Sequence, residues 1–138
     1  MTTGIDLIRL DHRRVGACFE EFARTRDATL VGQIFDMLTA HDDAEQGALY
    51  PLMEAVGVPA AKVADARRAH SLVQALMDHA RQQEGAALLA DVAALQQAVQ
   101  RHVHEEEQIL LLALEQRATP DQLDGLAARI LQVKQRVG

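Results

Sequence analysis

Apolar residues recur every three or four positions through most of the chain, which is the spacing of helices with one buried face. This pattern predicts four long helices at about 5–24, 29–50, 60–83 and 86–116, and a shorter one at about 120–136. No alternating run of β-branched residues between turn signals predicts a strand. Since short connections between long helices favour antiparallel neighbours, we expect an all-α, up-down-up-down four-helix bundle. The bundle would span about 5–116 of a single domain covering 1–138, with an additional C-terminal helix.

Turn and capping residues mark where these helices are expected to end. Pro51 is expected to kink or end the second helix. Gly57 and Pro59 predict a stop and a restart before the third helix, and Gly85 predicts the turn before the fourth. Residues 119–122 have the spacing of a capping box, with proline at the first helical position, and would open the last helix.

The predicted inward face of each long helix is interrupted by a histidine, and two of the faces also carry a glutamate. Burying an ionised carboxylate without a partner costs several kcal/mol or more, so these groups need a compensating charge. A pair of divalent metal ions would supply it, and neutral imidazole is a good metal ligand. The four faces read Ile8, His12, Val15, Phe19, Phe22; Ile34, Leu38, His41, Glu45, Ala48; Val63, Ala66, His70, Val73, Met77; and Leu88, Val92, Leu95, Val99, His102, Glu106, Ile109, Ala113.

The four histidines on these faces are also expected at one height in the bundle. Counted from turn centres near residues 27, 57 and 85, each lies 13 to 17 residues from its turn. The two histidines that flank a turn differ in this count by one to three residues, which is about 1.5 to 5 Å along a helix axis. His79 is too close to its turn to reach this layer, and His104 faces another side of its helix. The candidate metal ligands are therefore His12, His41, Glu45, His70, His102 and Glu106.

Charge and composition exclude several other classes of protein. The formal net charge is -6 and basic residues form only short pairs such as Arg13-Arg14, so nucleic acid and anionic membrane surfaces are poor partners. One cysteine, Cys18, allows no internal disulfide and fits a reducing compartment. The longest apolar run, at 109–114, is too short to span a bilayer, and no basic-then-apolar leader is present. We expect a cytoplasmic location.

The spacing of the candidate ligands resembles the hemerythrin-like family, in particular its HHE cation-binding branch. The matching pieces are two His-x-x-x-Glu motifs, at 41–45 and 102–106, with Asp11-His12 before them and His70 between them. Leu49-Tyr50-Pro51 and Leu110 follow the two motifs, and the resemblance covers about 5–115. Ferritin-like bundles pair Glu-x-x-His instead, and no such pair lies at the predicted layer.

This resemblance implies a non-haem di-iron centre with two iron ions of the Fe-O-Fe type, bridged by Glu45 and Glu106. The same ligands accept manganese or zinc. Four imidazoles and two bridging carboxylates supply about eight of the twelve contacts that two six-coordinate ions need, which leaves room for water, hydroxide, O2, NO or peroxide. Oxygen-carrying hemerythrins have a second histidine where this chain has Gln74, and an aspartate where it has Glu107. These departures predict a more open, exchangeable site.

Three functions remain open at this point. The first, which we favour, is a protein that binds or senses O2, NO, peroxide or iron. The second is a di-iron enzyme that acts on peroxide or NO, or in iron-centre repair, and the third is a metal-free helical interaction module.

Several residues near the candidate ligands are expected to have other roles. Asp42 and Asp43 would lie at the surface or hold imidazole protons. Glu105 and Glu107 would lie on a solvated face, and Tyr50 would pack at the end of the second helix. The last helix would cover the bundle or form a homodimer.

Overall fold

A computed structural model describes residues 2–137 and shows an all-α bundle. Helices α2 and α5 each continue through a short π-helical turn, labelled η1 and η2, into a further helix. In chain order the elements are α1 (Gly4–Thr25), α2 (Thr29–Ala44), η1 (Glu45–Leu49), α3 (Tyr50–Ala55), α4 (Ala60–Ala80), α5 (Gly85–Glu105), η2 (Glu106–Leu110), α6 (Leu111–Arg117) and α7 (Pro120–Val137). The all-α fold class is thereby confirmed.

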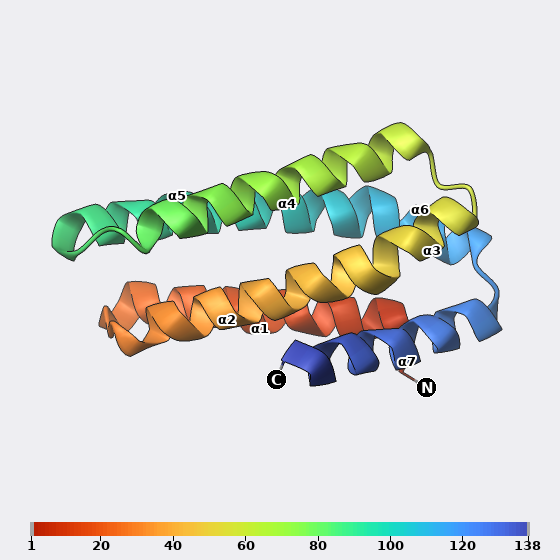
Figure 1. Cartoon of the computed structure of the whole chain (residues 1–138), viewed down its shortest axis with the longest axis horizontal. Helices are drawn as coiled ribbons and strands as arrows, with labels where there is room; N and C mark the ends of the chain where they lie inside the picture. Colours follow the sequence, from red (N-terminus) through yellow and green to blue (C-terminus); the bar gives the residue numbers. More distant parts are fainter. Residues whose placement is uncertain (1, 138) are drawn as a thin grey trace.

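The long helices form two antiparallel pairs that lie against each other (Figure 1). One pair consists of α1 and α2, and the other of α4 and α5, each joined by a tight connection at the same end of the bundle. Helix α7 turns back after α6 and runs along α1 and α2, as the contacts between these elements also show. The last helix therefore covers one side of the bundle.

The buried apolar residues form two clusters, one toward each end of the bundle. The first surrounds Ile8, Leu49 and Leu111 and includes residues of α7. The second surrounds Phe19 and Leu95. Fully burying a side chain of this size stabilises the fold by about 1.5–3 kcal/mol, so both ends are firmly packed. His12, which lies between Ile8 of the first cluster and Val15 of the second, belongs to a polar layer between them.

The two π-helical turns begin at the two glutamates of the His-x-x-x-Glu motifs. The backbone N–H of Tyr50 donates to the carbonyl of Glu45, and that of Leu111 donates to the carbonyl of Glu106. Each hydrogen bond thus spans five residues instead of four. The extra residue rotates everything that follows it around the helix axis.

This rotation corrects part of the predicted inward face of the fourth helix. Ile109 was expected inside, but its side chain is 46% exposed, and Ala113 is only half-buried. Leu110 and Leu114 take the buried positions instead. The predicted faces of the first three helices are buried throughout.

One of the two effects expected of Pro51, that it ends the second helix, is wrong. The helix does not end there, because Pro51 lies in the first turn of α3 and the helix continues to Ala55. A proline within a four-residue α turn clashes with a carbonyl and removes a hydrogen bond. The wider η1 turn immediately before it relieves this conflict. The helix ends shortly before Gly57, whose φ of +86° is the left-handed conformation typical of a residue after a helix.

The predicted start of the last helix is confirmed. The backbone N–H of Gln122 donates to Thr119 Oγ1 at 3.1 Å, and the side chain of Gln122 accepts from the backbone N–H of Thr119 at 2.9 Å. These reciprocal bonds are those of a capping box. Among the described residues no helix is sufficiently long and apolar to cross a membrane.

Candidate metal centre

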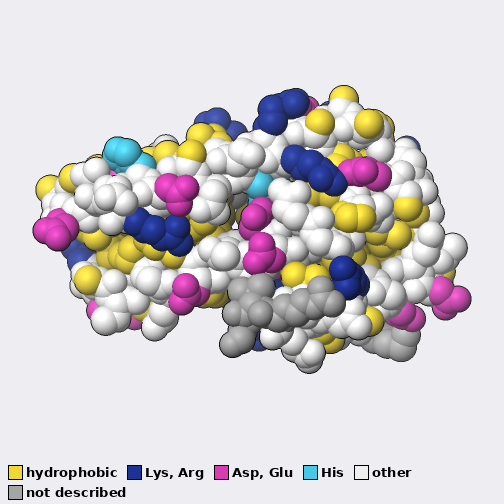
Figure 2. All heavy atoms as spheres, viewed as in Figure 1, with side chains coloured by type: hydrophobic (Ala, Val, Ile, Leu, Met, Phe, Trp, Pro, Cys, Tyr) yellow, Lys and Arg dark blue, Asp and Glu magenta, His cyan; other side chains and the backbone are white. Residues whose placement is uncertain are grey.

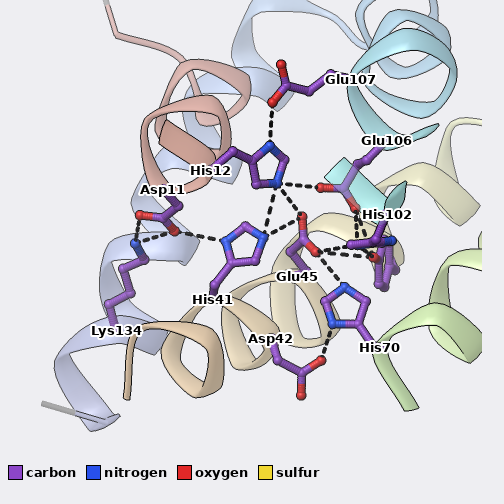
Figure 3. Close-up of polar contacts among 11 residues, drawn as sticks. Asp11, His12, His41, Asp42, Glu45, His70, His102, Glu106, Glu107 and Lys134 are labelled. Carbon is purple, nitrogen blue, oxygen red and sulfur yellow. Dashed lines mark hydrogen bonds and ion pairs between the residues drawn. The ribbon is translucent and has the colours of Figure 1, made fainter. Parts of the chain in front are cut away.

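All six candidate ligands predicted from the sequence meet in the polar layer between the two apolar clusters (Figure 3). They come from every long helix of the bundle, and each glutamate is the first residue of a π-helical turn. All six are buried, and the two glutamates are 0% exposed. The residues are His12 of α1, His41 of α2, Glu45 of η1, His70 of α4, His102 of α5 and Glu106 of η2.

The six side chains form two groups that share both glutamates. His12 and His41 form one group with Glu45 and Glu106, and we call it half-site 1. His70 and His102 form the other group with the same glutamates, and we call it half-site 2. Within each group four ligand atoms lie within 4.8 Å of one another.

The distances in half-site 1 are those of ligand atoms facing a common centre. His12 Nε2 lies 3.1 Å from Glu106 Oε1 and 3.2 Å from His41 Nε2, and His41 Nε2 lies 3.1 Å from Glu45 Oε2. Two ligand atoms bound about 2.1 Å from one ion at a right angle would be about 3 Å apart. These spacings therefore match a shared ion.

Half-site 2 has a similar arrangement. His70 Nε2 lies 2.6 Å from Glu45 Oε1, and His102 Nε2 lies 3.1 Å from Glu106 Oε2. The other oxygens of the two glutamates, Glu45 Oε2 and Glu106 Oε1, are buried without an aligned hydrogen bond among the described residues. Buried polar atoms normally have a partner, so these two oxygens are where the chemistry of the donor set fits a metal ion.

Three carboxylates lie behind the imidazole rings and contact their Nδ1 atoms. Glu107 Oε2 lies 2.6 Å from His12 Nδ1, and Asp11 Oδ2 lies 3.1 Å from His41 Nδ1. Asp42 Oδ1 lies 2.5 Å from His70 Nδ1. A carboxylate that accepts the Nδ1 proton leaves the Nε2 lone pair free for a metal and fixes the ring orientation. All three rings therefore present Nε2 to the centre.

Sequence reasoning placed only one of these three carboxylates correctly. Asp42 was expected to hold an imidazole proton or lie at the surface, and it contacts His70. Glu107 was expected on a solvated face, but its side chain is only 30% exposed and contacts His12. Asp11 was part of the family resemblance without an assigned role. Its position directly before His12 was the available signal, whereas the position of Glu107 depends on the η2 turn.

Tyr50 contributes more to the site than the packing role expected from the sequence. Its hydroxyl group donates to Glu106 Oε2 at 3.0 Å and lies 3.2 Å from Glu45 Oε1. Burial, together with the two nearby carboxylates, raises the pKa of this hydroxyl far above its ordinary value. The phenol therefore stays protonated and remains a hydrogen-bond donor to both glutamates.

Without a metal, the site is a cluster of mutually neutralising charges. Burial opposes a charge on the imidazoles, but the two buried glutamates outweigh it and raise the pKa of His12 and His102 to about 10. Glu45 and Asp11 likewise outweigh burial and raise the pKa of His41 to about 9. Burial likewise opposes ionisation of Glu45, but the histidines hold the pKa of its carboxyl well below its ordinary value. A metal ion must displace these protons.

The comparison with family models decides which family carries this arrangement. The model of the hemerythrin HHE cation binding domain matches residues 3–114, which includes all six candidate ligands. The chain belongs to this family. The resemblance found from the motif spacing is thereby confirmed, and membership in the hemerythrin HHE family implies a metal-binding site with histidine and glutamate ligands.

Comparison with individual proteins adds little to the family match. A protein of Nostoc sp. named DNA nickase is 42% identical over 50 residues, which make up 33% of this chain and 14% of that protein. The chain thus spans a small fraction of that relative. No solved structure matches.

A cavity of about 30 Å³ adjoins the histidines of this hemerythrin-like centre. The four imidazoles line one part of it, and the remaining walls are mostly apolar. One water molecule needs about 10–15 Å³ of such space, so the cavity suits a very small molecule. The apolar side chains are Val15, Leu38, Val73, Met77, Val99 and Val103.

A polar groove between α2 and α4 leads toward this cavity. It shares Asp42, His70 and Gln74 with the cavity lining. Figure 2 shows a small hollow near the middle of this face, with part of a histidine side chain visible in it and acidic side chains nearby. The side chain of Gln74, at the position of the additional family histidine, donates to Asp78 Oδ1 at 3.0 Å along its own helix.

The two histidines excluded by sequence reasoning lie outside the centre. His79 is exposed and contacts Asp91 at 2.6 Å. His104 is exposed on α5. Both expectations are confirmed.

Proposed function

We propose that this protein holds two metal ions, two irons in the cell, and that it binds or senses a small ligand such as O2, NO or peroxide. His12 and His41 would hold one ion, and His70 and His102 the other. Glu45 and Glu106 would bridge the two. The observation that carries this proposal is that both groups of four ligand atoms share the same two buried glutamates.

The ligand set supports iron but also accepts manganese or zinc, since imidazole and carboxylate suit all three. The four rings and two carboxylates leave coordination positions free on both ions. A pair of irons held here would bind a small ligand and exchange electrons with it. This is the chemistry that the family's metal centre supplies.

The surroundings of the centre support a small and uncharged ligand. Six apolar side chains wall the cavity beside the imidazoles, and a dry apolar wall disfavours charged molecules, which lose their hydration there. The diatomic gases lose little hydration and fit the small volume. The groove between α2 and α4 shares Asp42, His70 and Gln74 with the cavity lining and would be the route from solvent.

The residues around the ligands orient them and hold protons. Carboxylates at the Nδ1 atoms of His12, His41 and His70 fix those rings. The Tyr50 hydroxyl keeps its own proton and donates it in hydrogen bonds to the carboxylates of Glu45 and Glu106. Because these side chains are fixed before a ligand arrives, binding needs little reorganisation.

The proposal is tested by metal content and ligand titration of protein produced with iron supplied. We expect about two irons per chain and the near-ultraviolet absorption of a bridged di-ferric centre, with NO bound stoichiometrically. Glu106→Ala should lose these bands, whereas the matched change His104→Ala, at an exposed position nearby, should keep them. Consumption of peroxide or NO over many turnovers would support the enzyme alternative. If wild-type protein holds no stoichiometric metal, the remaining hypothesis is the metal-free helical interaction module.

The similarity to the DNA nickase does not lead us to propose DNA cleavage. The aligned 50 residues make up 14% of that protein. The formal net charge of -6 also opposes binding to a phosphate backbone.

A further inference from the structure

Helix α7 lies outside the four-helix bundle, yet it packs directly against the elements that carry half-site 1. It contacts α1, α2 and η1. Leu126, Ile130 and Val133 of α7 are buried and recur at helical spacing. The contacts with α1 and η1 are close, because a Cβ atom on Gly4 would lie 2.4–2.8 Å from Leu126, and one on Gly47 would lie 3.4 Å from Val133.

This packing brings the lysine after Val133 to the metal centre. The ammonium group of Lys134 contacts both carboxylate oxygens of Asp11 (Figure 3). Asp11 is 8% exposed, and its Oδ2 lies 3.1 Å from His41 Nδ1. A continuous polar path therefore runs from α7 through α1 to a ligand on α2.

The ammonium group of Lys134 stabilises the buried carboxylate of Asp11. Burying an ionised carboxylate without an opposite charge is costly, and the buried Asp11 carboxylate has the Lys134 ammonium group and the His41 ring as partners. Without the ammonium group, the buried carboxylate would lose a cationic partner and keep the contact with the His41 ring. It would then rotate toward solvent or admit water, and the His41 ring would lose its fixed orientation.

We propose that Lys134 is a positioning residue of the metal centre. It holds His41 in place through Asp11, so that metal binding in half-site 1 depends on α7. This inference rests on the proposed function, since it concerns how tightly a metal is held. Among the described residues, neither histidine of half-site 2 has a hydrogen bond or ion pair with Asp11 or Lys134. Its histidines lie on α4 and α5, and the carboxylate behind His70 is Asp42 of α2.

The test is a titration of metal-free protein with Co2+, followed by calorimetry and by visible absorption of the bound ion. Lys134→Met keeps the length of the apolar stem and removes the charge. Lys134→Arg keeps the charge. Arg129→Met removes the same charge from an exposed position of α7, where the side chain donates to Gln132 Oε1, and it serves as the matched control.

We expect Lys134→Met to lower the affinity for one of the two Co2+ ions about 10-fold and to change the visible spectrum of that ion. Residues that hydrogen-bond to metal ligands contribute about 10- to 100-fold in affinity. The other ion should stay within about 2-fold of wild type. Lys134→Arg should restore most of the loss, and Arg129→Met should behave as wild type. In a His41→Ala background, which disables half-site 1, Lys134→Met should have no further effect.

Several results would overturn the inference. They are unchanged affinities in Lys134→Met, an equal loss at both ions, or an equal loss in Arg129→Met. If wild-type protein binds two Co2+ ions and Lys134→Met changes nothing, only the role of Lys134 fails. If wild-type protein binds none, the proposed function itself fails.

Discussion

Replacing Tyr50 with phenylalanine removes one hydroxyl oxygen from the centre and leaves the packing of the ring intact. That hydroxyl lies 3.0 Å from Glu106 Oε2 and 3.2 Å from Glu45 Oε1. A hydrogen bond to a charged group contributes about 1.5–3 kcal/mol. Neither carboxylate is left without a partner, because His70 lies 2.6 Å from Glu45 and His102 lies 3.1 Å from Glu106. We therefore expect a loss near the low end, about 1–2 kcal/mol in metal-free protein.

The assay is urea unfolding of metal-free protein, in which the midpoint should fall while the slope stays constant. With about 2.1 cal/mol/K of unfolding entropy for each residue, the same loss lowers the melting temperature by about 3–7 °C. A double-mutant cycle with Glu106→Gln should show that part of this free energy is shared by the pair. A Tyr50→Phe variant as stable as wild type, or more stable, would refute the hydrogen bonds to ionised carboxylates.

Three further predictions concern pH, helix register and α7. In metal-free protein the pKa of His12 and His102 is about 10 when folded against 6.5 for the free side chain; the histidine contribution to stability should be complete below about pH 6.5 and be lost as pH rises through about 10. Urea unfolding across this range checks it, and a rise in stability would contradict it. Leu110→Ala should cost about 2–5 kcal/mol and Ile109→Ala less than about 1 kcal/mol; equal costs in urea unfolding would refute the η2 register. Gly4→Ala should destabilise by about 1–3 kcal/mol because its Cβ would overlap a leucine of α7; an unchanged thermal midpoint would contradict that packing.

Much of the fold could be predicted because periodicity and turn residues agreed. The faces carrying His12, His41 and His70 are buried as expected, since ordinary α-helical spacing holds along them. Counting residues from the turns also placed the four histidines in one layer. That reasoning works because helical rise is nearly constant.

The wrong predictions about the second and fourth helices result from the two π-helical turns. A run of apolar residues at 109–114 fits either the α-helical or the shifted register, so the sequence could not show that Leu110 replaces Ile109 inside. The same kind of turn explains why Pro51 does not end its helix. Both turns start at the glutamates, where buried carboxylates and neighbouring helices determine the backbone as much as local propensity does.

The outer contacts of the site could not be predicted, because they join residues far apart in the chain. Lys134 and Asp11 are separated by 123 residues, and Tyr50 and Glu106 by 56. Helical periodicity says which face a residue occupies, but not which distant side chain it meets. The packing of α7 was open between covering the bundle and dimerisation, and its contacts with α1 and α2 show the former.

The most direct test of the shared centre is to count the ions bound by each variant by native mass spectrometry. Wild-type protein should hold two ions per chain, and His41→Ala should hold one, since it removes a ligand of half-site 1 alone. Glu45→Ala should hold neither tightly, because Glu45 belongs to both half-sites. A Glu45→Ala variant that keeps one ion at wild-type affinity would contradict the bridged pair, and a wild-type protein without stoichiometric metal would contradict the whole account.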